Sequence, residues 1–182
     1  MEKKLFVITG PSGAGLRDII GNLFEHRSDV AAVLPVTARK MRAGEQDGVG
    51  FRFYDLEGWK LLKESGDLLE QTVFAGNDYG TSRTLVEETL RSGKNALLNL
   101  SVDRAAQIKQ HMPEAVCVYV EPSDPEILRA RYAETARSRW ELAVRMQEAE
   151  EQRALSGFCD ARVASDDLQA AERELNRLLD EA

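Results

Sequence analysis

Residues 5–17 read Leu5-Phe6-Val7-Ile8-Thr9-Gly10-Pro11-Ser12-Gly13-Ala14-Gly15-Leu16-Arg17. The first five residues are apolar or β-branched and predict a short buried strand, and the glycine-rich segment behind them predicts a tight turn. From Asp18 onward the spacing predicts a helix whose apolar face consists of Ile19, Ile20, Leu23 and Phe24. A strand, a glycine-rich loop and a helix in this order are typical of a phosphate-binding loop.

The loop departs from the phosphate-binding pattern G-x-x-x-x-G-K-[ST] at its last two positions. In that pattern backbone N–H groups surround the phosphates, the lysine neutralises the β/γ oxygens and the hydroxyl binds Mg²⁺. Here an apolar Leu16 replaces the lysine, and Arg17 stands at the magnesium position, where it repels the cation. The alternative is that the segment is only a tight turn, but its flanking elements favour a phosphate loop with the candidate residues Gly10, Ser12, Gly13 and Gly15.

Length and composition predict a compact domain, which is either one large domain or one domain with an inserted lobe. The chain has 182 residues, of which 43% are hydrophobic, and this is enough for a full core. A net charge of −7 disfavours a nucleic acid polymer as partner. Two histidines are too few for a metal cluster, and Cys117 and Cys159 are interpreted as separate free thiols, so no metal site is predicted. No stretch resembles a membrane helix or a signal peptide, so a membrane partner is not expected and the predicted location is cytoplasmic.

The rest of the chain alternates strands with helices, which predicts a parallel sheet covered on both faces. Strands are predicted at Ala31–Leu34, Asn95–Leu100 and Val116–Val120. Helices are predicted at Ser82–Arg91, Glu126–Tyr132, Thr135–Leu155, where Trp140 belongs to an apolar stripe, and after Asp166-Asp167.

Residues 35–81 differ in character and predict an inserted lobe. Aromatic residues at Val49–Tyr54 and the stretch Asp67–Phe74 predict short antiparallel strands joined by glycine turns. Two arginines three positions apart can present donor forks to one phosphate, and a nearby carboxylate can orient them. The lobe holds the densest set of candidate ligand residues in the chain, namely Arg39, Arg42, Glu45, Glu70, Tyr79 and Thr81.

Four segments in the right order resemble the guanylate kinase family. They are residues 8–15, Thr37-Ala38-Arg39-Lys40-Met41-Arg42-Ala43-Gly44-Glu45 with its continuation to Val49, Gly66-Asp67-Leu68-Leu69-Glu70, and Gly76-Asn77-Asp78-Tyr79-Gly80-Thr81. The resemblance implies a P-loop nucleoside monophosphate kinase-like three-layer fold, with a parallel sheet flanked by helices, a mixed α/β GMP-binding lobe and a helical lid. The whole chain, 1–182, is then a single domain with a core at 1–34 and 82–182, the lobe at 35–81 and the lid at about 132–145.

The same resemblance implies roles for single residues. Those matching Arg39, Arg42 and Tyr79 hold the GMP phosphate in that family, and those matching Glu70 and Thr81 read the guanine. Arg145 matches a phosphate-binding arginine of the lid. Mg-ATP is the implied cofactor, although Leu16 and Arg17 argue against its binding here.

Further departures affect both halves of the expected site. On the GMP side, Pro35 replaces a phosphate-binding serine and Phe51 replaces a tyrosine. Neutral Asn99 and Ser101 replace carboxylates, and Asp103-Arg104 stands where glutamine and glycine are expected. In the lid, Ala133-Glu134-Thr135-Ala136 replaces a stretch rich in arginine and glycine, and Ser165 replaces an adenine-contacting asparagine.

The leading hypothesis is a guanylate kinase-like protein with little or no kinase activity that acts as a binding or regulatory module. Its ligand is GMP, another phosphorylated small molecule or, by analogy with scaffold domains of this fold, a phosphopeptide. The alternative is an active ATP:GMP phosphotransferase in which Arg17 or Arg145 supplies the missing positive charge. A third hypothesis is a kinase of the same fold with a different phosphoryl acceptor.

Overall fold

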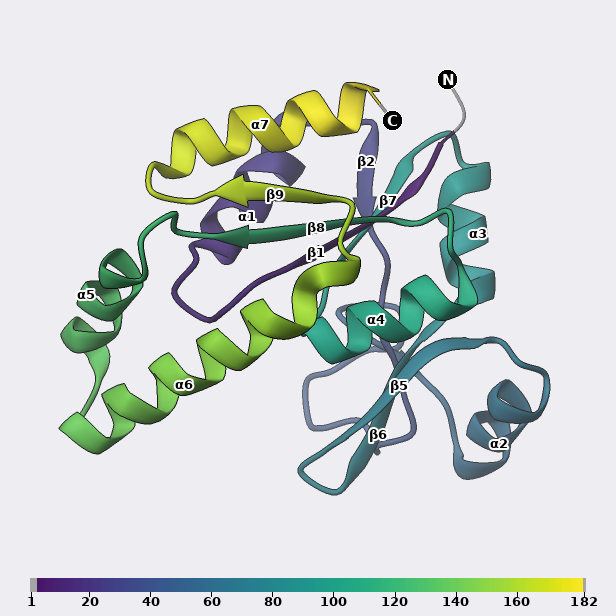
Figure 1. The fold of residues 1–182 in the computed structure, drawn as a ribbon. Helices are drawn as coiled ribbons and strands as arrows, with labels where there is room; N and C mark the ends of the chain where they lie inside the picture. The colour runs from purple at the N-terminus through teal and green to yellow at the C-terminus, as the bar shows by residue number, and fades with distance from the viewer. Residues whose placement is uncertain (1–2, 182) are drawn as a thin grey trace.

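A five-stranded parallel sheet forms the centre of the molecule in this computed structural model, which describes residues 3–181 (Figure 1). Its strand order is β2 (Val30–Ala32), β7 (Asn95–Asn99), β1 (Leu5–Thr9), β8 (Val116–Glu121) and β9 (Ala161–Ala164). Every neighbouring pair is parallel. The strand predicted at residues 31–34 lies one residue earlier and ends sooner, while the other predicted central strands are present.

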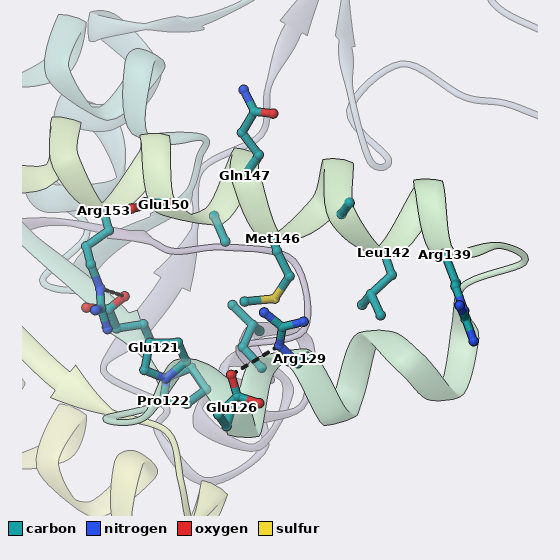
Figure 2. A pocket seen from close by; sticks show the side chains of 14 residues that line it. Glu121, Pro122, Glu126, Arg129, Arg139, Leu142, Met146, Gln147, Glu150 and Arg153 are labelled. Carbon is teal, nitrogen blue, oxygen red and sulfur yellow. Dashed lines mark hydrogen bonds and ion pairs between the residues drawn. The ribbon is translucent and has the colours of Figure 1, made fainter.

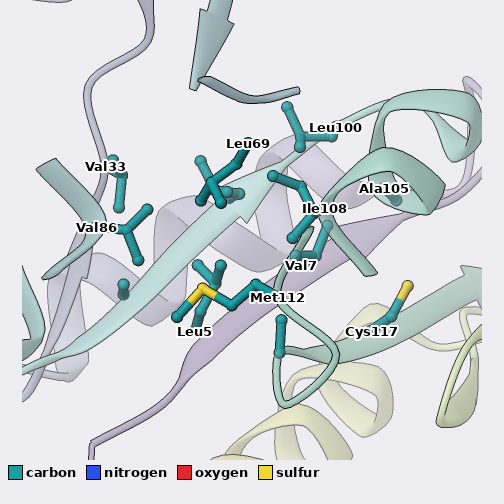
Figure 3. Close-up of a cluster of buried hydrophobic side chains, with 13 residues drawn as sticks. Leu5, Val7, Val33, Leu69, Val86, Leu100, Ala105, Ile108, Met112 and Cys117 are labelled. Atoms are coloured by element: carbon teal, nitrogen blue, oxygen red, sulfur yellow. The ribbon is translucent and has the colours of Figure 1, made fainter. Parts of the chain in front are cut away.

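Helices cover both faces of this sheet, because neighbouring residues of a strand point to opposite sides. Leu5 and Val7 pack against α3 (Arg83–Arg91) and α4 (Val102–His111) in a fully apolar cluster (Figure 3). Phe6 and Ile8 pack on the other face against α1 (Leu16–His26) and α7 (Leu168–Glu181). The predicted three-layer α/β fold is therefore confirmed.

A second, four-stranded sheet lies below the main one in Figure 1 and is built from β4 (Arg52–Phe53), β3 (Val36–Thr37), β6 (Asn77–Ser82) and β5 (Leu68–Phe74). The predicted antiparallel pairing of the 49–54 segment is wrong: β4 runs parallel to β3, its neighbour in the sheet. Strand β5 is antiparallel, and it pairs with β6 across a tight turn at Ala75-Gly76. Composition predicts a strand but not its partner, since pairing depends on the path of the chain between them.

Helix α2 (Leu56–Glu64) was not predicted. It begins behind Asp55, whose Oδ1 accepts a hydrogen bond of 2.7 Å from the backbone N–H of Gly58. Only Trp59 of this helix is buried, at 4% exposure. With a single deeply buried residue the apolar periodicity is weak, so the capping aspartate was the only local signal.

The segment after β8 forms α5 (Pro125–Thr135) and α6 (Arg139–Leu155), followed by the short 3₁₀ turn η1 (Ser156–Phe158). The helix predicted at residues 135–155 is present but begins later, at Arg139, because Ser138 Oγ caps it at the backbone N–H of Glu141. Trp140 does not belong to an apolar stripe, since 76% of it is exposed. The two helices meet instead through Leu128, Tyr132, Leu142, Met146 and Ala149.

The interpretation of Cys117 and Cys159 as separate thiols is wrong, because the two side chains are in contact. Strands β8 and β9 are neighbours, and this brings Cys117 Sγ to 2.8 Å from Cys159 Sγ, where the thiols share a hydrogen bond. The bond raises the pKa of Cys117, as does burial, and it lowers the pKa of Cys159. Across residues 3–181 no cluster of His, Cys, Asp or Glu could hold a metal ion, and no helix is long and apolar enough to cross a bilayer.

Candidate functional site

The predicted phosphate loop is a tight glycine-rich turn between β1 and α1. A Cβ at Gly10 would lie 2.1 Å from the Val120 carbonyl oxygen, so only glycine permits the close approach of the loop to β8. Gly13 and Gly15 adopt φ of 81° and 83°, and α1 begins immediately behind Gly15. The loop therefore directs the N-terminus of an eleven-residue helix toward the carboxyl end of the sheet.

The two altered loop positions serve other purposes in the structure. Helix α1 begins at Leu16, two residues before the predicted start. The half-buried Leu16 side chain packs with Leu168 against the apolar cluster between the sheet and α7, and Arg17 is exposed. Asn99 and Ser101, both exposed, place an amide and a hydroxyl where the family expects carboxylates. This donor set does not fit Mg-ATP, since it supplies neither a lysine for the β/γ oxygens nor anionic groups for the metal.

Helix α5 covers the loop. Ser12 Oγ donates a 3.2 Å hydrogen bond to Tyr132 Oη, and a Cβ at Gly13 would lie 2.9 Å from the same aromatic ring. Arg131 Nη1 donates to the Gly13 carbonyl at 2.9 Å, and its Nη2 donates to the Ser165 carbonyl at 2.7 Å. These contacts hold α5, the loop and the end of β9 together as one unit.

The two candidate catalytic arginines lie in different surroundings. The Arg145 guanidinium stacks on the Tyr132 ring at 4.8 Å, and its Nη1 donates to Thr135 Oγ1 at 2.9 Å. Arg17 is exposed at the start of α1, and its side chain donates to no acceptor within residues 3–181. Burial raises the pKa of the Tyr132 phenol.

A pocket of about 700 Å³ lies between the second sheet and the carboxyl end of the main sheet. Of the six lobe residues predicted to bind a ligand, five line it: Arg39, Arg42, Glu45, Tyr79 and Thr81. The sixth, Glu70, is 1% exposed and lies behind the wall. Thus the fold brings together side chains that are up to 42 positions apart in sequence (81 − 39).

Arg39 is a structural centre of this pocket. Its Nη1 and Nη2 each donate to Glu45 at 2.6 Å, and its guanidinium lies 5.0 Å and 5.1 Å from the ring centres of Phe51 and Phe53. Only 6% of the side chain is exposed. Phe51, which replaces a tyrosine of the family, therefore contributes a face for the guanidinium rather than a hydroxyl for a ligand.

Unlike the Arg39 side chain, the Arg42 side chain is not held by a hydrogen bond or an ion pair within residues 3–181. Its backbone N–H donates to Glu45 Oε2 at 2.7 Å, so the same carboxylate shapes both ends of the loop. The Arg42 guanidinium itself is exposed, lines the pocket and donates to no acceptor among the described residues. It is the donor fork of this loop that can reach an anion without breaking an existing pair.

Acid should loosen the loop through Glu45. Hydrogen bonds from Arg39 and from the Arg42 N–H lower the pKa of Glu45 from 4.5 to about 2. A lowered folded-state pKa means that the stabilisation is complete above about pH 4.5 and is lost as the pH falls toward 2. We expect the difference in urea midpoint between wild type and Glu45→Gln to shrink over this interval, while Glu64→Gln on exposed α2 changes nothing. A constant difference would contradict this role of Glu45.

A buried ion pair closes the inner end of the pocket. Glu70 accepts hydrogen bonds from Thr81 Oγ1 at 2.7 Å, from Arg104 Nε at 2.6 Å and from Arg104 Nη2 at 2.7 Å. Arg104 comes from the first turn of α4 and lines the pocket. The sequence marked Arg104 only as a departure from an expected glycine, because its distance of 34 positions from Glu70 concealed the pair.

A second pocket, of about 760 Å³, lies between α5 and α6 (Figure 2). Leu142 and Met146 form part of its apolar wall, and Arg153 donates to Glu121 at 2.8 Å at one end. None of the predicted phosphate-loop residues and none of the six candidate ligand residues of the lobe line it. Part of its charged rim is internally paired, since Arg153 donates to Glu121 and Arg129 donates to Glu126.

Comparisons with known proteins agree with this geometry. The guanylate kinase from Oceanobacillus iheyensis is 34% identical over 168 residues, covering 92% of this chain and 82% of that protein. The guanylate kinase from Synechocystis is 35% identical over 182 residues, covering 100% and 95%. The crystal structure of guanylate kinase from Anaplasma phagocytophilum shares the fold, with a TM-score of 0.65 at 20% identity over 100% of this chain and 87% of that one. Since the family model for guanylate kinase also matches residues 2–182, this chain belongs to the guanylate kinase family.

Proposed function

We propose that this chain is a binding member of the guanylate kinase family, with little or no phosphoryl transfer, that holds a phosphorylated small ligand in the pocket of the second sheet. The observation that carries the proposal is where the structure places Leu16 and Arg17. Leu16 is used for packing against the core, and Arg17 faces solvent. Catalysis of phosphoryl transfer is almost entirely positioning and charge stabilisation, so both losses affect the same step.

The lobe pocket supports the binding half of the proposal. The Arg42 guanidinium lines the pocket together with Tyr79 and has no partner within residues 3–181, and the Arg39–Glu45 pair fixes the loop that carries it. A planar fork of donors suits the oxygens of a phosphate monoester. In this proposal residues 35–81 act as the ligand lobe and residues 132–145 as a lid whose Arg145 is held on Tyr132.

The binding test uses ribose 5-phosphate, a phosphomonoester without a base. Calorimetry should detect its binding to wild type, and Arg42→Ala should weaken it by about 10- to 100-fold because a charge-assisted hydrogen-bond pair is lost. Lys40→Ala is the matched control: it removes a neighbouring exposed cation that does not line the pocket. Absent binding, or equal losses in both variants, would overturn the proposal.

The catalytic test follows GMP with Mg²⁺ and ATP by phosphorus NMR at high protein concentration. We expect no GDP above a protein-free control. GDP formation that disappears in Arg17→Ala or Arg145→Ala would instead establish an enzyme with substitute arginines. Phosphorylation of another acceptor, with GMP unchanged, would favour a kinase of different specificity.

A further inference from the structure

Arg104 presents a two-donor fork to Glu70. Nε donates to one carboxylate oxygen at 2.6 Å and Nη2 donates to the other at 2.7 Å. Parallel N–H donors on adjacent nitrogens are also what the N1–H and 2-amino groups of guanine offer, because that edge of the base contains a guanidine unit. Arg104 on α4 thus presents to Glu70 the same pattern of N–H donors that a bound guanine would present.

Glu70 has little capacity left for a ligand. Its side chain is 0% exposed, and Thr81 Oγ1 already occupies a further site on Oε1. It does not line the pocket, whereas Thr81 and Arg104 do. A guanine could reach the carboxylate only by displacing the guanidinium, and the displaced Arg104 would lose two charge-assisted hydrogen bonds.

The pocket end that remains accessible is rich in donors. Arg104 Nη1 donates to no acceptor within residues 3–181, and 20% of the Arg104 side chain is exposed at the pocket wall. Ser101 and Asn99 also line this region, so no carboxylate stands at either position. Donors facing the pocket select acceptors on the ligand.

We propose that Arg104 is a specificity-determining residue that prevents Glu70 from accepting hydrogen bonds from guanine. The pocket then binds phosphomonoesters that carry, at the end opposite the phosphate, a hydrogen-bond acceptor instead of two adjacent N–H donors. This inference rests on the proposed function, since it presupposes that the phosphate is held beside Arg42. It adds a prediction about the hydrogen-bonding groups at the end of the ligand that lies opposite the phosphate.

The test compares three purine nucleotides with different groups at C2, of which the xanthine nucleotide also differs at N3, which carries a proton or a negative charge. GMP carries an amino donor there, IMP carries hydrogen and xanthosine monophosphate carries a carbonyl acceptor. For wild type, calorimetry should give the order xanthosine monophosphate, IMP, GMP, with about tenfold or more between the first and the last. Affinity for GMP equal to or above that for xanthosine monophosphate would overturn the proposal.

Variants at Arg104 should reverse this order. In Arg104→Gly, which restores the residue expected in the family, and in Arg104→Ala, which suits a helix better, Glu70 is free to accept from a base. GMP should then bind about tenfold or more tightly than IMP. If a folded variant, checked by circular dichroism, shows no such preference, the proposal fails; if neither variant folds, the wild-type order decides alone.

The two proposals fail in different ways. Ribose 5-phosphate has no base, so its binding to wild type does not depend on Glu70 or Arg104. Binding of ribose 5-phosphate together with a wild-type preference for GMP would overturn the role of Arg104 and leave the phosphate pocket standing. If neither ribose 5-phosphate nor any of the nucleotides binds, the proposed function fails, and the role of Arg104 fails with it.

Discussion

Replacing Leu16 by lysine and Arg17 by threonine in one variant is expected to create magnesium-dependent ATP binding at least about 100-fold tighter than that of the wild-type chain. The backbone of the loop already has the required form, with Gly10 against β8 and left-handed Gly13 and Gly15. The lysine would neutralise the β/γ oxygens, and the threonine hydroxyl would contact Mg²⁺. Calorimetry with ATP, with and without Mg²⁺, measures the gain.

The single variants serve as controls for this result. Leu16→Lys alone should raise ATP affinity without full magnesium dependence, whereas Arg17→Thr alone should gain little because the lysine is still missing. The lysine stem can lie along the contact with Leu168, so the fold should survive the loss of Leu16. A double variant that folds without any gain in ATP affinity would show that α5, through Tyr132 and Arg131, blocks the loop itself.

Removing Arg104 alone is expected to lower the free energy of unfolding by about 3 kcal/mol, because it leaves the fully buried Glu70 without its partner. In a domain of this size such a loss corresponds to a fall in Tm of about 10 °C. The variant is Arg104→Met, which retains much of the apolar stem. Urea unfolding and calorimetry measure the loss.

Two further variants separate the buried pair from arginine removal in general. Glu70→Leu combined with Arg104→Met should recover most of the stability, since an apolar pair of similar volume is often neutral. Arg129→Met removes an exposed partner of Glu126 and should cost less than about 1 kcal/mol. Equal losses in Arg104→Met and Arg129→Met would contradict the buried-pair account of Glu70.

The loop and the main sheet could be predicted because their signals are local. Continuous apolar runs predicted β1, β7 and β8, and a capping serine predicted α3, whose first turn is held by Ser82 Oγ at the backbone N–H of Leu85. The lobe was harder. β4 pairs parallel to β3, and α2 buries little besides Trp59, so neither strand alternation nor helical periodicity distinguished them.

For the candidate site, the sequence showed which residue types are present but not which side chains pair with one another. The chain itself shows that Leu16 and Arg17 replace the functional pair of a phosphate loop, and that Arg39, Arg42 and Tyr79 recur at family spacing. It does not show that the Arg39 guanidinium is hydrogen-bonded to Glu45, while the Arg42 guanidinium has no acceptor among the described residues. Charge and side-chain length are identical for both arginines, so only burial and neighbours separate them.

Patterns among neighbouring residues were enough to predict the alternation of apolar strands and helices, the glycine loop and the loss of the loop lysine. Three contacts could be found only in the folded chain: Cys117 with Cys159, α5 with the loop, and Arg104 with Glu70. These contacts join residues from 34 to 120 positions apart, and such pairs form only when folding brings distant elements of the chain together.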